Sequence, residues 1–175
     1  MIKNKNNEKT WFALYTKPRS EFKASQQLAG VEVEHYLPTI TRLKQWSDRK
    51  KKVTEPLIRG YIFIYATENQ RLASVEQPSI VRCVFDGGHP ASIPDWQIDN
   101  IRKMLSLKSE IIVYNGIVSG TKVKIKNGPF EGVIGIVTNN EMGKSISISI
   151  DLLNRSVITR VPQGSELELV KETLD

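Results

Sequence analysis

The spacing of apolar and polar positions predicts two kinds of domain in succession. Runs rich in β-branched and aromatic residues predict strands or extended chain over residues 10–15, 33–40, 60–65 and 80–85. Apolar spacing and cap residues predict helices over residues 18–30, 94–105 and 69–77, the last with Asn69 as its cap. In chain order these elements form a βαββαβ unit with an extra helix, the outline of a ferredoxin-like α/β sandwich of the α+β class.

Beyond residue 107, apolar residues alternate with polar ones at a period of two. Five such segments, separated by turn residues, lie at 121–126, 133–138, 145–150, 155–160 and 166–170. Short, evenly spaced strands are typical of a small barrel, which closes its sheet and removes open edges. We therefore expect an α/β domain over 1–107, a flexible link over 108–120 and a five-stranded β-barrel over 121–175.

The composition of the barrel segments also disfavours a helical state. Within residues 145–161, seven residues are β-branched and most of these alternate with serine or other polar residues. β-branched residues lose side-chain freedom in a helix, and serine competes for backbone hydrogen bonds. We therefore expect the barrel to form from the outset in the full-length chain.

Positive charge is concentrated in the first third of the chain. Residues 1–60 hold 13 basic and 6 acidic side chains, a net +7, whereas residues 61–175 hold 12 and 13, a net −1, which together give +6. Within residues 42–52, RLKQWSDRKKK, six basic residues accompany one acidic residue. This run suits an exposed hairpin. It could attract nucleic-acid phosphates, or it could be a solvated segment that maintains solubility.

Residues able to perform chemistry are few and scattered. The two histidines, His35 and His89, are far apart and have no partners at the spacing of a metal site. Cys83, the single cysteine, lies in an apolar strand, where a buried cysteine acts as a small hydrophobic residue. We therefore expect no enzymatic activity, no metal and no cofactor.

The chain also lacks signals for membranes or secretion. No stretch is apolar enough to cross a bilayer, and the polar amino terminus lacks the apolar segment of a signal peptide. A single cysteine fits a reducing compartment. We therefore expect a cytoplasmic monomer without membrane contact.

A basic cluster at the start of the first predicted helix points to binding. Arg19 and Lys23 are four residues apart and would share a helix face, with Lys17 just before the helix and Gln27 one turn further on. Side chains of these types contact phosphates and bases, and a solvated helix face is the alternative.

Three aromatic residues lie on predicted strands: Tyr15, Tyr61 and Phe63. Core packing is the ordinary role of such side chains. An exposed aromatic depression that accepts a partner helix is the sharper hypothesis, and the spacing leaves both open.

Several segments of the chain resemble the NusG family of transcription elongation factors. WFALYTKPRSEFKASQQL, EPLIRGYIFI and VRCVFDGGHPASIP resemble its amino-terminal (NGN) domain, and GTKVKIKNGPFEGVIGIV resembles the KOW motif that opens its SH3-like barrel. The resemblance covers residues 11–170 and implies both domains in the family order, without catalysis.

The resemblance also implies binding partners. It implies docking on the clamp helices of RNA polymerase through Tyr15, Tyr61 and Phe63. It implies contact with the non-template DNA strand through Lys17, Lys23 and Gln27. Because they belong to basic clusters, we add as nucleic-acid candidates Arg19, Arg49 and Lys50.

Two details suggest a specialised member of the family. LPTITRLKQWSDRKKKVTEPL is similar to the same region of the RfaH and UpxY antiterminators, which implies operon-specific antitermination, with a polysaccharide operon as the expected target. Leu153 stands where the general factor carries a partner-binding Phe, and residues 117–175 hold seven basic and seven acidic side chains, so a ribosomal protein is a better expected partner there than RNA. The alternatives are a housekeeping NusG-type elongation factor and a KOW-containing ribosome- or RNA-binding protein.

Overall fold

The structure is a computed structural model that describes residues 8–107 and 110–170. Residues 1–7, 108–109 and 171–175, which belong to the predicted first domain, link and barrel, lie outside the described residues. Contacts between Cα atoms divide the chain into two compact units, residues 1–95 and 96–175. The predicted domain limits at 107 and 121 stay a prediction.

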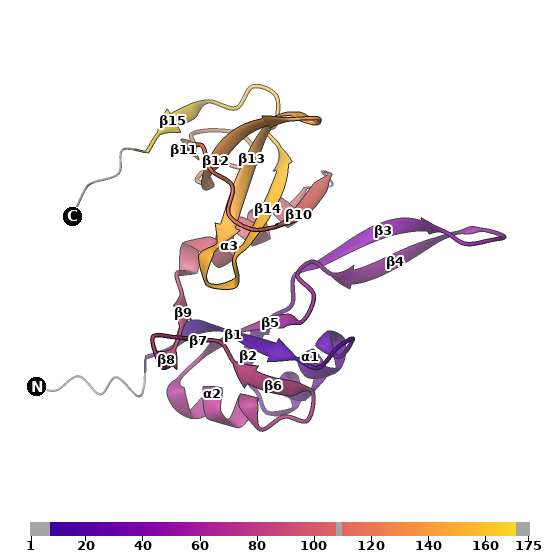
Figure 1. Ribbon diagram of the computed structural model, residues 1–175, viewed down its shortest axis with the longest axis vertical. Helices are drawn as coiled ribbons and strands as arrows, with labels where there is room; N and C mark the ends of the chain where they lie inside the picture. The colour runs from indigo at the N-terminus through magenta and orange to yellow at the C-terminus, as the bar shows by residue number, and fades with distance from the viewer. Residues whose placement is uncertain (1–7, 108–109, 171–175) are drawn as a thin grey trace, which may run out of the picture. The chain divides into compact units, whose positions relative to one another are not determined.

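The first unit is built around an antiparallel sheet (Figure 1). Its elements are β1 (Thr10–Thr16), α1 (Glu21–Gly30), β2 (Glu34–Tyr36), β3 (Thr39–Gln45), β4 (Lys50–Pro56), β5 (Tyr61–Ala66), α2 (Glu68–Val75), β6 (Ile80–Cys83), β7 (Phe85–Asp86), β8 (His89–Pro90) and β9 (Ser92–Ile93). The sheet order is β2-β5-β1-β6, and β9 also pairs with β1. All four predicted strand regions supply strands to this sheet, which agrees with an NGN-like fold.

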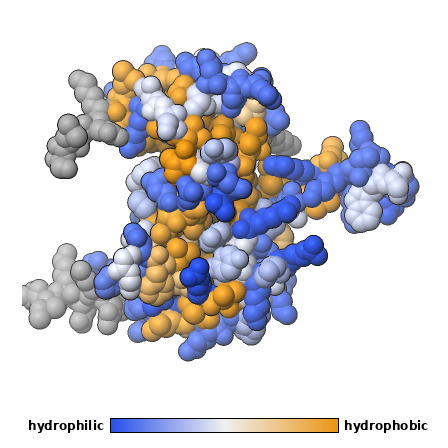
Figure 2. Space-filling view, in the orientation of Figure 1, coloured by the Kyte–Doolittle hydropathy of each residue, from blue (hydrophilic) through white to orange (hydrophobic). Residues whose placement is uncertain are grey.

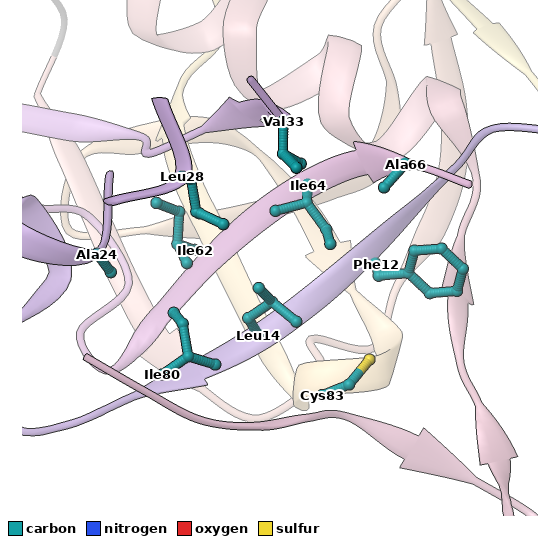
Figure 3. Packing of buried hydrophobic residues seen from close by; sticks show 10 residues of the cluster. All are labelled: Phe12, Leu14, Ala24, Leu28, Val33, Ile62, Ile64, Ala66, Ile80 and Cys83. Carbon is teal, nitrogen blue, oxygen red and sulfur yellow. The ribbon is translucent and has the colours of Figure 1, made fainter. Parts of the chain in front are cut away.

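Helices cover one face of this sheet. Ile62 and Ile64 of β5 meet Leu28 of α1 in a buried cluster (Figure 3). Val75 of α2 is partly buried and packs against this cluster. Successive side chains of a strand point to opposite faces, so the aromatic side chains of β5 occupy the other face. The helix-covered face therefore supplies this cluster, and the opposite face carries the candidate aromatic residues, of which Phe63 is also fully buried.

Both crossover helices begin at residues other than those predicted. Arg19 has φ of 58°, in the left-handed region, and α1 begins two residues further on. Arg19 is therefore outside the helix, and its predicted i,i+4 pairing with Lys23 is wrong. Helix α2 is capped by Thr67 and not by Asn69, because Thr67 and Gln70 bond each other's backbone N–H groups in a capping box.

Strands β3 and β4 form a two-stranded sheet of their own that projects from the first unit (Figure 1). Every residue from Thr41 to Lys52 is exposed, and the projection is mostly hydrophilic (Figure 2). The predicted exposed hairpin over 42–52 is confirmed. We call β3, β4 and the turn between them the arm.

The second unit is a helix on a curved sheet. Its elements are α3 (Asp95–Ser106, in this unit from Trp96 on), β10 (Ile111–Asn115), β11 (Thr121–Ile125), β12 (Ile134–Asn140), β13 (Gly143–Ile150), a 3-10 turn (Asp151–Leu153), β14 (Arg155–Arg160) and β15 (Leu167–Leu169). The five strands expected beyond residue 120 are all present, as β11 to β15.

The closed five-stranded barrel that we expected is not found. The sheet has six strands in the order β10-β14-β13-β12-β11-β15, and within residues 110–170 its two end strands do not pair with each other. The added strand, β10, lies in the region expected to be a link. It extends the sheet because it pairs along β14 and buries Ile111 opposite Thr159.

Helix α3 is fixed to this sheet by side-chain hydrogen bonds. Asn100 Nδ2 donates to the carbonyl oxygen of Ile134 at 2.9 Å, and Lys103 Nζ donates to that of Glu131 at 2.9 Å. Asn100 is buried, and Ile101 on the next position is fully buried. Of the helices in the described residues, none is long and apolar enough to span a membrane.

Candidate functional site

Two tyrosines from neighbouring strands form a pair on the sheet face away from the helices. Tyr15 of β1 lies directly opposite Tyr61 of β5, and their ring centroids are 5.4 Å apart at 60°. This edge-to-face geometry is a favourable arrangement of aromatic rings. Tyr15 is 37% exposed, so the pair presents ring surface and hydroxyl groups to solvent. The structure therefore brings two of the three predicted aromatic residues together.

The turn before Tyr61 holds this pair in place. Gly60 has φ of 83°, and a Cβ there would lie 3.2 Å from Tyr15 Cε2, so glycine suits both the turn and the close ring. Gly60 N donates to Glu21 Oε1 at 2.8 Å, and Thr16 N donates to the carbonyl oxygen of Gly60 at 2.8 Å. Hydrogen bonds with both β1 and α1 therefore fix the backbone of the turn that precedes Tyr61.

Phe63 differs from the two tyrosines because it is fully buried. It lies opposite Ala13 of β1 and Tyr36 of β2 in the sheet register. A ring without exposed surface can support a binding site from beneath, but it offers no area to a partner. Its role in polymerase binding stays a prediction.

The backbone of Ser79 joins Lys17 to Gln27. Lys17 N donates to the carbonyl oxygen of Ser79 at 2.9 Å, and Ser79 N donates to Gln27 Oε1 at 3.0 Å. Ser79 is 3% exposed, so Gln27 satisfies a buried N–H group. Lys23 is exposed one helical turn before Gln27, on the same face of α1. We call Lys17, Lys23 and Gln27 the basic corner.

The other predicted nucleic-acid residues lie elsewhere. Arg19 is exposed in the segment between β1 and α1. Arg49 and Lys50 lie at the far end of the arm, where Trp46 N donates to the carbonyl oxygen of Arg49 at 2.8 Å and closes the turn. The predicted set is therefore divided between a corner fixed to the core and an exposed arm.

Cys83 belongs to a buried structural cluster. It is 2% exposed, and burial raises the pKa of its thiol, an effect that the nearby Arg71 guanidinium opposes. Arg71 Nε donates to Glu68 Oε2 at 2.8 Å, and this bonding lowers the pKa of the Glu68 carboxyl. The burial agrees with a hydrophobic role for Cys83. Among the described residues, no group of His, Cys, Asp and Glu side chains could hold a metal ion.

Leu153 ends the 3-10 turn of the second unit and is 5% exposed, so its side chain belongs to the core. Asn154 follows with φ of 48° and is exposed. Gln97 Nε2 of α3 donates to Asp151 Oδ2 at 3.3 Å, which ties the helix to the start of this turn. A partner-binding role for Leu153 stays a prediction, and Asn154 is the neighbouring side chain that solvent reaches.

Two residues that fix the site, Glu21 and Ser79, were not predicted from the sequence. Glu21 bonds to Gly60 across 39 positions, and Ser79 bonds to Gln27 across 52. No local pattern signals contacts between segments so far apart. Glu21 is an acidic residue in the first turn of α1, where it is favoured by the helix dipole. Its position therefore indicates a helix start and does not indicate the bond to Gly60.

Comparisons with known proteins agree with this architecture. The family model described as NusG, transcription termination factor nusG, matches residues 9–102, more than half of the chain. A solved structure described as "Domain interaction in Thermotoga maritima NusG" matches 94% of this chain and 98% of that chain, at 20% identity and a TM-score of 0.50. The MjSpt4:Spt5 complex in conformation A matches 92% and 99%, at 15% identity and a TM-score of 0.34, too low to support an argument. The match to the family model shows that the chain belongs to the NusG family, whose members are transcription factors and not enzymes.

Proposed function

We propose that this protein is an operon-specific elongation and antitermination factor. It binds RNA polymerase and the non-template DNA strand, and it suppresses pausing and termination without performing chemistry. One observation supports this most strongly: Tyr15 and Lys17 flank Thr16 at one end of β1. A surface suited to a protein therefore lies directly beside a surface suited to nucleic acid.

The tyrosine pair is the proposed contact with the polymerase clamp helices. Tyr15 and Tyr61 offer rigid, amphipathic rings, which are the side chains that most often dominate the binding energy of an interface. The fixed turn at Gly60 keeps both rings in one arrangement, so little conformational entropy is lost on binding.

The basic corner is the proposed contact with the displaced DNA strand. Lys17 and Lys23 supply positive charge for phosphates, which gives affinity without sequence preference. Gln27 accepts a hydrogen bond from Ser79 through its amide oxygen, so its orientation is set and its amide nitrogen carries the two donors available for a base. We infer that any base preference at this corner depends on Gln27.

The second unit is proposed to be the KOW module of the family. Its charge is balanced, with seven basic and seven acidic side chains in 117–175, which favours a protein partner over RNA. We propose a ribosomal protein as that partner, bound near the turn at Leu153 and Asn154. The similarity of residues 37–57 to specialised family members supports a polysaccharide operon as the target.

Transcription in vitro tests the proposal. Purified polymerase should read through pauses in a long operon leader when the protein is added, and should pause as before on unrelated templates. Equal effects on every template would indicate the housekeeping factor, and no effect on polymerase would leave the ribosome- or RNA-binding alternative.

Polymerase binding tests the site itself. Tyr61→Ala should weaken binding roughly 5–30-fold, equivalent to about 1–2 kcal/mol for one interface aromatic. Tyr114→Ala is the matched control, because Tyr114 is an exposed tyrosine of the second unit. A folded Tyr61→Ala protein that binds as well as the control would contradict the proposed docking surface.

A further inference from the structure

The arm carries positive charge on both of its faces. Lys44 lies directly opposite Lys51 in the hairpin register, so these two side chains share one face. Arg42 lies two positions before Lys44 and shares that face. Lys50 and Lys52 flank Lys51 along β4, so they point to the opposite face.

Side-chain contacts agree with this division. Lys51 Nζ lies 5.4 Å from the centre of the Trp46 ring, which places Trp46 on the first face. Thr41 and Thr54 lie opposite each other on the second face, and their hydroxyl oxygens are 2.8 Å apart. The two faces are therefore distinct, and each has lysines near the end of the arm.

Solubility alone does not account for the arm. Trp46 is 53% exposed and Leu43 is 65% exposed, and large apolar side chains in water work against solubility. Each face carries one of them. Between residues 42 and 52 the single acidic side chain is Asp48. Cations mixed with exposed apolar side chains suit a partner that is anionic and also offers apolar surface, as DNA does with its phosphates, sugars and base edges.

We propose that the arm binds double-stranded DNA by standing in the major groove, with each basic face toward one phosphate backbone. The proposal rests on the proposed function, which already brings the protein beside DNA. A single strand has one backbone and would engage one face of the arm. The major groove of B-form DNA is about 12 Å wide and admits a two-stranded ribbon, whereas the deep, narrow major groove of duplex RNA does not.

Salt-dependent binding of the full-length protein to a labelled DNA duplex tests this proposal. Each phosphate contact contributes about 0.9 to the slope of log affinity against log salt concentration. Lys51→Gln on the first face and Lys52→Gln on the second should therefore each flatten the slope by about 0.9. Lys44 is left unchanged in this test because its ammonium already pairs with the Glu55 carboxylate at 2.8 Å. Lys124→Gln, at an exposed position in the second unit, makes the same charge change and should leave the slope unchanged.

Three outcomes would overturn the proposal. In the first, only the variant of one face flattens the salt slope. In the second, the arm variants flatten it no more than the control does. In the third, the arm variants flatten it equally when the duplex DNA is replaced by single-stranded DNA or duplex RNA. Polymerase binding, measured in parallel, separates this proposal from the proposed function. The arm variants should keep polymerase binding, and Tyr61→Ala should keep the duplex slope. A failed arm test with a successful Tyr61 test would reject the duplex contact alone.

Discussion

The basic corner and the arm both carry positive charge, but they are held by the rest of the domain in very different ways. In the basic corner, Lys17 and Gln27 bond to the buried backbone of Ser79. In the arm, every residue from Thr41 to Lys52 is exposed to solvent. A fixed amide can discriminate between bases, whereas exposed lysines attract phosphate in any sequence. Under the proposed function, one domain would therefore combine base preference at the basic corner with general affinity for phosphate along the arm.

The same contrast extends to stability. Gln27 is adjacent to Leu28, which is fully buried in the core of the first unit, so changes there affect folding and binding together. The ion pairs of the arm are partly or largely exposed, and pairs of this kind contribute little to folding. Substitutions in the arm can therefore test the proposed DNA contact while leaving the fold intact.

The largest expected difference is in stability, between truncation of the buried Leu28 beside Gln27 and truncation of the exposed Leu43 in the arm. Leu28→Ala should lower the free energy of unfolding by about 2–5 kcal/mol, because it leaves a cavity in the core. Leu43→Ala in the arm should change it by less than about 0.5 kcal/mol, because Leu43 is 65% exposed. Urea unfolding of both variants measures the difference. Similar losses from the two substitutions would mean that the arm is part of the core's cooperative unit.

A smaller effect is expected from the glutamine that orients the basic corner. Gln27→Ala should lower the free energy of unfolding by about 1–3 kcal/mol, because it leaves the buried N–H of Ser79 without its acceptor. Gln26→Ala, at the exposed neighbouring position, is the control and should have little effect. Thermal unfolding of the two variants checks this, and equal stability would show that Gln27 does not fix the corner.

The smallest effect is expected at the base of the arm. A hydrogen bond from Lys44, with the charges of Arg59 and Arg42, holds the pKa of the Glu55 carboxyl below its ordinary value. The contribution of the ionised Glu55 carboxylate to the free energy of unfolding is therefore present above the ordinary carboxyl pKa. It is lost as the pH falls through the lowered pKa of the folded state. Glu55→Gln should cost about 0.2–1 kcal/mol at pH 7, as for other exposed pairs.

Unfolding of wild type and Glu55→Gln at pH 7 and at pH 3 measures this contribution. The difference between the two proteins should shrink at the lower pH. A difference that stays constant or grows on acidification would show that Glu55 acts through packing and not through its charge.

The sequence predicted those features that depend on neighbouring residues. The continuous apolar run before Ala66 predicted β5, and the charge of residues 42–52 predicted an exposed hairpin. Helix starts were predicted less well. The left-handed backbone at Arg19 has no signal in the sequence, whereas Thr67 and Gln70 have the spacing of a capping box, a signal that was missed. The bond from Gly60 to Glu21 joins distant segments, so no local pattern could indicate it.

The predicted closed barrel is not found within residues 110–170, for a related physical reason. Period-two alternation indicates which face of a strand is buried, but it does not show which strands pair at the ends of a sheet. Ile111 lies in a segment that looked like a link, yet it is buried opposite Thr159 and begins a sixth strand. The candidate site was predicted in part: its residue types and its two separate basic clusters were found, and the hydrogen bonds that tie Lys17 and Gln27 to Ser79 were not.

The hydrogen bonds of α3 limit where genes of this family can recombine and still encode a folded protein. Asn100 reaches the backbone of Ile134, and Gln97 reaches Asp151, so the helix is matched to the sheet that follows it. A recombination junction after the helix would combine an α3 inherited from one parent with a sheet inherited from another. A junction before Trp96 would transfer both together. Viable natural chimaeras of this protein with its relatives should therefore carry their crossovers ahead of the helix.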